Sequence, residues 1–323
     1  MDWELQYEKD VAAQTTSGPH TIGTKEMDAN RAVAAQLKDI MPFADLHKMN
    51  DCDLIYRFLI AKKWAVETTV VAMREYIDYR KKENLDGLLW ESFPEKAELM
   101  AAPYRGFDKE GHPLYIDQPD PALLTQLLTE FPRELLLRVH LRAMEEGRRL
   151  QKMYNTDRVT CAIDFSNMTM SIVRNTKALG FMKEMSHYDQ MYYPENMRTM
   201  LICNGGWTFS AAYKIVKPWL DPRVQQKIHF MGGGANFGPE VHKFVEPAQL
   251  PPGSFLGTHN GTPLIDKVTL RAEVPVGSAP RIINEASHTK ILFHNSDMPP
   301  AENLQGEPPE EATVDFNDDD DLL

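Results

Sequence analysis

Residues 192–231 decide the fold of this chain, and they read YYPENMRTMLICNGGWTFSAAYKIVKPWLDPRVQQKIHFM. A short apolar run at 200–203 predicts a buried strand, and residues 227–231 predict another. Between them, six residues stand at offsets 0, 3, 4, 7, 10 and 11, the spacing of one apolar stripe on a helix. They are Phe209, Ala212, Tyr213, Val216, Trp219 and Leu220. From pattern alone, a helix packed on a core explains this stripe better than a functional helix does.

The alternation of strands and helices continues upstream of this stretch. Strand-like residues at 113–117 and 158–164 alternate with helical patterns at 133–153 and 171–188. Strands that alternate with helices predict an α/β layer built on a largely parallel sheet.

The rest of the chain divides by composition. Apolar residues recur at helical spacing over 30–100, so we expect a small N-terminal helical unit before a main domain at 101–260. The flanks are polar. We expect a flexible arm at 1–29, a C-terminal extension at 261–300 with strand potential near 267–274 and 290–293, and a disordered acidic tail at 301–323.

The negative charge of the chain is concentrated in that tail. The 323 residues carry a net charge of −12, but nine acidic residues and no basic residue lie at 301–323, so the remainder carries only −3. A nearly balanced body without a basic face argues against nucleic acid as a partner. The chain has no run of about 18 apolar residues, so we expect no membrane-spanning helix.

Patterns for catalysis or metal binding are missing. Cys52, Cys161 and Cys203 are too far apart for a metal motif and odd in number, which fits a reducing cytoplasm. The histidines have no paired ligand spacing, and the common hydrolase and phosphate-loop motifs are absent. The glycines at 232–238 are one residue off the dinucleotide-binding fingerprint, so we interpret them as a loop. We therefore expect no catalytic residues, no metal and no cofactor.

Several short motifs occur together over roughly residues 50–258. They are Arg57-Phe58-Leu59-Ile60-Ala61-Lys62-Lys63-Trp64, Gly106-x-Asp108-x-x-Gly111-x-Pro113, Tyr193-Pro194-Glu195, Asn204, Phe209, Lys217-Pro218-Trp219-Leu220-Asp221-Pro222 and Lys227-Ile228. In this combination the chain resembles the CRAL-TRIO lipid-binding family, which includes the Sec-fourteen-type phosphatidylinositol and phosphatidylcholine transfer proteins. The match is most specific over 192–231.

The resemblance implies an apolar lipid pocket over a curved sheet, enclosed by helices. It also implies that a helix at 208–220 acts as a gate that opens at a membrane. Burial of acyl chains stabilises such a complex by about 0.8 kcal/mol per CH₂. Tyr213 and Trp219 suit brief contact with a bilayer, because each has an apolar body and a polar tip. We expect a cytoplasmic protein that exchanges a phospholipid without covalent chemistry and contacts membranes peripherally and transiently.

The resemblance also assigns a headgroup site. Glu195 and Lys227 stand where phosphoinositide-binding members contact the inositol phosphate headgroup, and Thr169, Ser171 and Tyr115 fall near positions that contact phosphatidylcholine. The pattern is altered at neighbouring positions, where this chain has Ile60, Asn196, Gly205-Gly206 and Val224. Phosphatidylinositol is the favoured ligand.

Two alternatives stay open. The altered positions leave room for another lipophilic ligand, such as a tocopherol- or retinoid-like molecule. The ending Asp318-Asp319-Asp320-Asp321-Leu322-Leu323 resembles an acidic dileucine signal, so the protein could instead be a lipid-sensing adaptor whose tail docks a protein partner. Solubility is the simpler explanation of the acidic tail.

Overall fold

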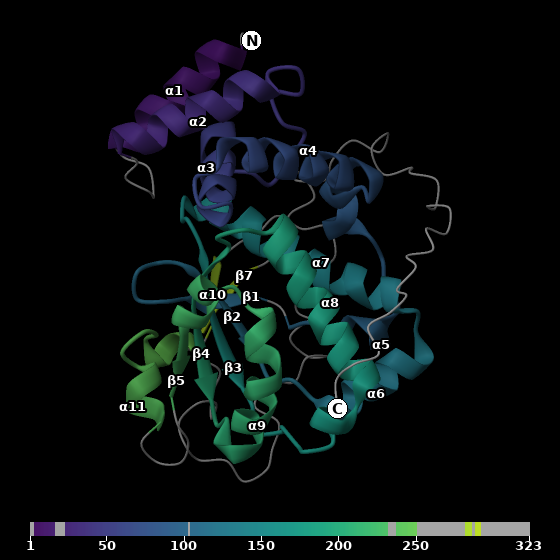
Figure 1. Ribbon diagram of the computed structural model, residues 1–323. Helices are drawn as coiled ribbons and strands as arrows, with labels where there is room; N and C mark the ends of the chain where they lie inside the picture. Colours follow the sequence, from purple (N-terminus) through teal and green to yellow (C-terminus); the bar gives the residue numbers. More distant parts are fainter. Residues whose placement is uncertain are drawn as a thin grey trace.

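An N-terminal helical unit forms one end of the molecule in the computed structural model (Figure 1). The structure describes residues 3–16, 23–102, 104–231, 237–250, 282–285 and 288–291. The unit consists of α1 (Trp3–Thr16), α2 (Thr24–Leu37), α3 (Asp51–Ala61) and α4 (Val66–Lys82). Its helices share one core, in which Leu37, Ile55, Phe58 and Met73 are fully buried. The helical unit expected from the sequence is therefore present.

Helix α1 differs from the expected flexible arm. Tyr7 and Val11 lie one helical turn apart and are buried in the core of the helical unit. The Tyr7 hydroxyl donates to Asn30 Oδ1 at 2.7 Å, and the Asn30 amide donates to the Cys52 carbonyl at 3.0 Å. Two apolar anchors on an otherwise polar helix give too weak a periodic signal for prediction.

Five strands form the central sheet in the order β1-β2-β3-β4-β5. They are β1 (Tyr104–Phe107), β2 (Pro113–Asp117), β3 (Val159–Asp164), β4 (Met197–Cys203) and β5 (Ile228–Phe230). β1 and β2 pair antiparallel, and positive φ occurs at Gly106, within the irregular strand β1, and at Gly111, in the turn. The remaining pairs are parallel. The predicted mixed, mainly parallel sheet is confirmed.

Sequential strand order places the crossover helices on one face of the sheet, because such connections are right-handed. These helices are α6 (Pro121–Glu130), α7 (Arg133–Tyr154), α8 (Thr176–Tyr192) and α9 (Gly206–Val216). The connections also contain the short helical segments η2 (Ile172–Arg174), η3 (Lys217–Trp219) and α10 (Pro222–Gln226). α7 packs closely, since a Cβ at Gly147 would lie 2.1 Å from the Tyr104 hydroxyl oxygen. Figure 1 shows α8 and α9 on one side of the strands and α11 (Phe237–Val241) on the other.

The opposite face of the sheet has a compact apolar core. Leu114, Ala162 and Leu201 point to this face and pack with Val241 and Val245. Short elements complete the described chain: η1 (Leu85–Trp90), α5 (Glu95–Glu98), η5 (Pro247–Gln249), β6 (Ile282–Glu285) and β7 (His288–Ile291). β6 and β7 form a hairpin, and β7 lies beside β1.

The predicted element boundaries are close to those of the structure over the sheet. Strand β2 matches its prediction, whereas β4 begins at Met197, three residues earlier than expected. β7 overlaps the strand potential near 290–293. The strand potential at 267–274, the glycine loop at 232–236 and the acidic tail at 301–323 lie outside the described residues. Within the described part of the chain, no helix is long and apolar enough to span a bilayer.

Candidate functional site

Glu195 and Lys227 come together at the N-terminal ends of two parallel strands. The segment Tyr193-Pro194-Glu195 joins α8 to β4, and Lys227 caps α10 directly before β5. Because β4 and β5 run parallel, residues that precede them meet at the same edge of the sheet. Lys227 Nζ donates to Glu195 Oε2 at 2.8 Å and to the Met197 carbonyl at 3.0 Å. The two residues that the sequence singled out are therefore an ion pair.

Two arginines surround this ion pair. Arg158 Nη2 lies 3.4 Å from Glu195 Oε2, and Arg223 Nη1 lies 3.8 Å from Glu195 Oε1. Glu195, Lys227, Arg158 and Arg223 are called the charged cluster below. Burial opposes ionisation of Glu195, but the hydrogen bond from Lys227 and the nearby arginines hold its pKa below the ordinary value. Burial lowers the pKa of Lys227, and Glu195 partly offsets this effect.

The backbone of the charged cluster is held from the N-terminal helical unit. Glu195 adopts a left-handed conformation with φ of 53°, which a non-glycine residue seldom takes. Arg57 of α3 donates to the Glu195 carbonyl at 3.0 Å and also to the Asp157 carbonyl. In return, Arg223 donates to the carbonyls of Ile60 and Ala61 at the end of α3. The helical unit and the sheet thus fix the cluster together.

The predicted hydroxyl ligands lie elsewhere. Thr169 and Ser171 are exposed beyond the C-terminal end of β3, and their side-chain oxygens hydrogen-bond to each other at 2.6 Å. Tyr115 lies in the middle of β2, where its hydroxyl accepts from the Ala102 amide and donates to Asp117. The structure does not bring these three residues beside Glu195 and Lys227. Their role as ligands stays a prediction.

The apolar stripe predicted for 208–220 lies on α9 and η3. Phe209 and Ala212 are buried, and the other four members are half-buried. Lys214 and Lys217, which lie off the stripe, are exposed. The stripe therefore faces the protein, although most of it is incompletely covered.

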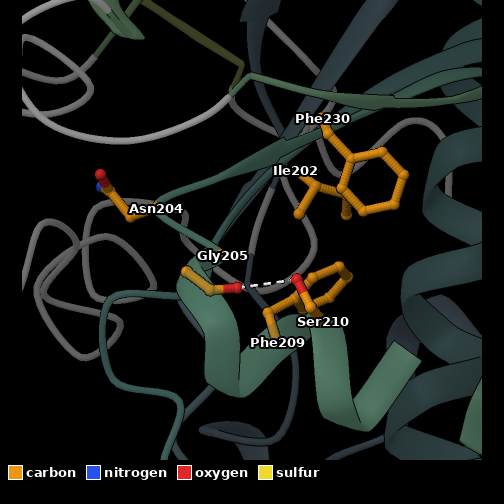
Figure 2. Close-up of a pocket in the computed structure, with 7 residues that line it drawn as sticks. Ile202, Asn204, Gly205, Phe209, Ser210 and Phe230 are labelled. Atoms are coloured by element: carbon orange, nitrogen blue, oxygen red, sulfur yellow. Dashed lines mark hydrogen bonds between the residues drawn. The ribbon is translucent and has the colours of Figure 1, made fainter. Parts of the chain in front are cut away.

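A pocket of about 380 Å³ lies at the start of α9, between that helix and the C-terminal ends of β4 and β5. Figure 2 shows Ile202 and Phe230 facing Phe209 across it. The Asn204 side chain points away from these three and donates to Asp164 Oδ1 at 3.1 Å. Aromatic contacts link Phe209 with Phe165, Tyr213 and Phe230. The pocket is mainly apolar.

Comparison with known proteins identifies the central part of the chain, because residues 98–254 match the CRAL/TRIO domain family. The protein contains a CRAL/TRIO domain. It is 26% identical over 254 residues to the SEC14 cytosolic factor of Eremothecium gossypii, covering 76% of this chain and 81% of that protein. It is 28% identical over 227 residues to the phosphatidylinositol/phosphatidylcholine transfer protein SFH9 of Arabidopsis thaliana, covering 64% of this chain and 37% of that protein.

A solved structure with the same fold is the crystal structure of Sfh5. It has a TM-score of 0.58 and 16% sequence identity, and the match covers 74% of this chain and 91% of that chain. At this identity the likeness establishes the fold only. The N-terminal helical unit precedes the CRAL/TRIO domain, since α1 to α4 all end before residue 98.

Sequence reasoning missed two exposed aromatic residues, of which Phe230 lines the pocket and Trp207 follows the lining residue Gly206. Trp207, in the first turn of α9, is 72% exposed, and Phe230, at the end of β5, is 55% exposed. By contrast, the predicted interfacial residues Tyr213 and Trp219 are half-buried. A tryptophan two residues before the first residue of the stripe was the available signal. Among the described residues, no group of three or more His, Cys, Asp or Glu side chains is placed to hold a metal ion.

Proposed function

We propose that this protein binds a phospholipid, most favourably phosphatidylinositol, and exchanges it between membranes without covalent chemistry. One observation carries the proposal: the charged cluster and the apolar pocket lie at opposite ends of the same strands. The cluster precedes β4 and β5, whereas the pocket is lined by Ile202 and Phe230 at their far ends. The seven residues of β4 span about 23 Å. A ligand that fills both sites needs a charged head and a long apolar tail.

The names of the relatives support the same class of ligand. Several relatives in Arabidopsis thaliana are called phosphatidylinositol/phosphatidylcholine transfer proteins. We therefore assign lipid exchange to the CRAL/TRIO domain and phosphatidylinositol to its charged cluster.

The size of the pocket supports a gating role for α9. About 380 Å³ is near the lower end for drug-sized ligands, and a lipid with two acyl chains is larger. Lipid entry therefore requires α9 to move away from β5. The half-buried stripe of α9 then covers the acyl chains on one side, and the exposed Trp207 and Phe230 offer apolar contact to a bilayer. We expect this contact to be transient and the protein to reside in the cytoplasm.

The charged cluster favours an inositol headgroup over choline. A carboxylate such as Glu195 accepts hydrogen bonds from ring hydroxyls, whereas the methyl groups of choline donate none. Lys227 can exchange its bond to Glu195 for one to the lipid phosphate, since both acceptors are anionic oxygens. Phosphatidylcholine, with Thr169 and Ser171 as its contacts, is the second candidate among phospholipids.

Transfer of labelled phosphatidylinositol between vesicles tests this function. Lys227→Ala should slow the transfer at least about tenfold, because a charge-assisted hydrogen bond contributes about 1.5 to 3 kcal/mol. Lys243→Ala is the matched control, since Lys243 is an exposed lysine that pairs with Glu240 and lies outside the charged cluster. Equal transfer by wild type and Lys227→Ala would refute the headgroup assignment. Absence of transfer by the wild type would refute lipid exchange itself.

A further inference from the structure

Arg158 is the member of the charged cluster that pairs with carboxylates without a hydrogen bond to either of them. Lys227 hydrogen-bonds to Glu195 at 2.8 Å, and Arg223 Nε bonds to Asp221 at 3.0 Å. Arg158 has only longer ion-pair contacts, to Glu195 at 3.4 Å and to Asp157 at 3.5 Å. Its Nε is buried and has no hydrogen-bond partner within the described part of the chain. The hydrogen-bonding capacity of this guanidinium is therefore largely unused.

The Asp157 carboxylate is already engaged by another cation. His112 Nε2 lies 3.0 Å from Asp157 Oδ1, and His112 Nδ1 lies 3.2 Å from Asp108. Hydrogen bonds to these two carboxylates raise the pKa of His112 to about 9, so the imidazole is charged at neutral pH. Asp108 also accepts from Thr160 and pairs with Arg198 at 3.1 Å. Asp157 is therefore shared between His112, through Oδ1, and Arg158, through Oδ2.

Arg158 is nevertheless held in place. Arg57 is 7% exposed, and its Nε pairs with Asp53 at 2.7 Å. Its two terminal nitrogens donate to the carbonyls of Glu195 and of Asp157, the residue before Arg158. One buried arginine thus fixes both backbone segments that carry Glu195 and Arg158. The Arg158 side chain is 24% exposed, so a ligand can reach it.

We propose that Arg158 binds the phosphate of the lipid headgroup, beside Lys227, and thereby favours lipids that carry a phosphate. This inference rests on the proposed function. A guanidinium with free donors matches two phosphate oxygens in a bidentate manner. The cluster contains one carboxylate and three cations, so it favours an anionic group such as a phosphate.

Lipid uptake with and without a phosphate tests the assignment. Purified protein is offered fluorescent phosphatidylinositol, or fluorescent diacylglycerol with the same acyl chains, each from a cyclodextrin carrier that adds no competing phospholipid. The wild type should prefer phosphatidylinositol. Arg158→Ala should lose about ten- to a hundredfold of that preference through weaker phosphatidylinositol uptake, with diacylglycerol uptake unchanged. Arg158→Lys should recover part of the preference, because lysine restores the positive charge but not the bidentate geometry of a guanidinium.

Arg138→Ala is the matched control, since Arg138 has a similar exposure of 25% but is paired with Glu91 and Glu83. This variant should keep the wild-type preference. The role of Arg158 would be overturned if Arg158→Ala kept the wild-type preference, or if its uptake of both lipids fell equally. Either result would leave lipid exchange standing. If the wild type takes up neither lipid, the proposed function fails first. Glycerophosphoinositol that binds as tightly as the lipid would assign the site to a free phosphodiester and overturn the lipid assignment.

Discussion

His112 joins two carboxylates that precede and follow it in the chain. It bridges Asp108 in the β1–β2 turn and Asp157 before β3, and its side chain is only 13% exposed. These bonds raise its pKa from 6.5 to about 9. Because the folded-state pKa lies above the ordinary value, the stabilisation is fully present below about pH 6.5 and is lost as the pH rises through about 9.

We predict that the free energy of unfolding of the wild type falls by about 2 kcal/mol between about pH 6 and 9.5, after allowance for partial solvent access to His112. His112→Gln should lack this part of the pH dependence and should be less stable at about pH 6. Urea unfolding at several pH values measures the effect, with His187→Gln, a substitution at an exposed residue, as the control. Identical pH profiles for wild type and His112→Gln would contradict the assignment.

The sequence predicted individual site residues only where a motif marked them. Glu195 and Lys227 stand in short, specific motifs, and the structure places them in one ion pair. Arg158 lies at the start of a strand with no motif around it, so its proximity to Glu195 follows only from strand order. Thr169 and Ser171 follow the opposite, C-terminal end of β3. The sequence pattern alone could not show that this end lies apart from Glu195 and Lys227.

At the scale of single elements, we place the hinge of α9 at the segment after η3, where α8 holds the backbone. Gln190 of α8 donates to the Trp219 carbonyl at 2.9 Å and accepts from the Asp221 amide at 2.9 Å. One amide side chain therefore holds both sides of residue 220, where the stripe ends. Helix periodicity predicted the stripe but could not predict this contact, because Gln190 lies on another helix.

Gln190→Ala should loosen this hinge, since each lost hydrogen bond contributes about 1 kcal/mol. We expect faster amide hydrogen exchange over residues 206–221 and, if α9 is the gate, faster phospholipid transfer. Gln126→Ala, which removes an exposed side chain bonded to Glu130, is the control and should leave both unchanged. Wild-type exchange rates in the Gln190→Ala variant would rule out the hinge role.

Across the whole molecule, a buried ionic network joins the N-terminal helical unit to the CRAL/TRIO domain. Glu145 of α7 accepts from Arg80 of α4 at 2.7 Å and from the Tyr193 hydroxyl at 2.8 Å, and it contacts His47 at 2.6 Å. Burial opposes its ionisation, but Arg80, His47 and Arg148 hold the pKa of Glu145 well below the ordinary value. The network ends two residues before Glu195, so it also fixes the segment that enters the charged cluster.

Glu145→Gln should lower the free energy of unfolding by about 3 to 5 kcal/mol, because it removes one of the carboxylates that balance the buried Arg80 and Arg148. Glu184→Gln, which removes the partly exposed pair with Arg133, should cost no more than about 1 kcal/mol. Urea midpoints of the two variants measure the difference. Equal midpoints would show that the network does not join the two parts. The sequence predicted the N-terminal helices and the mainly parallel sheet, but it could not predict a network whose members lie far apart in the chain.

Identification of the lipids that co-purify with the protein from cells tests the central claim most directly. Mass spectrometry of the wild type should find a phospholipid, with phosphatidylinositol enriched over its share of the cellular lipids. Lys227→Ala should lose that enrichment. Recovery of a tocopherol- or retinoid-like molecule with no enriched phospholipid, or of no lipid at all, would contradict phospholipid exchange as the function of this protein.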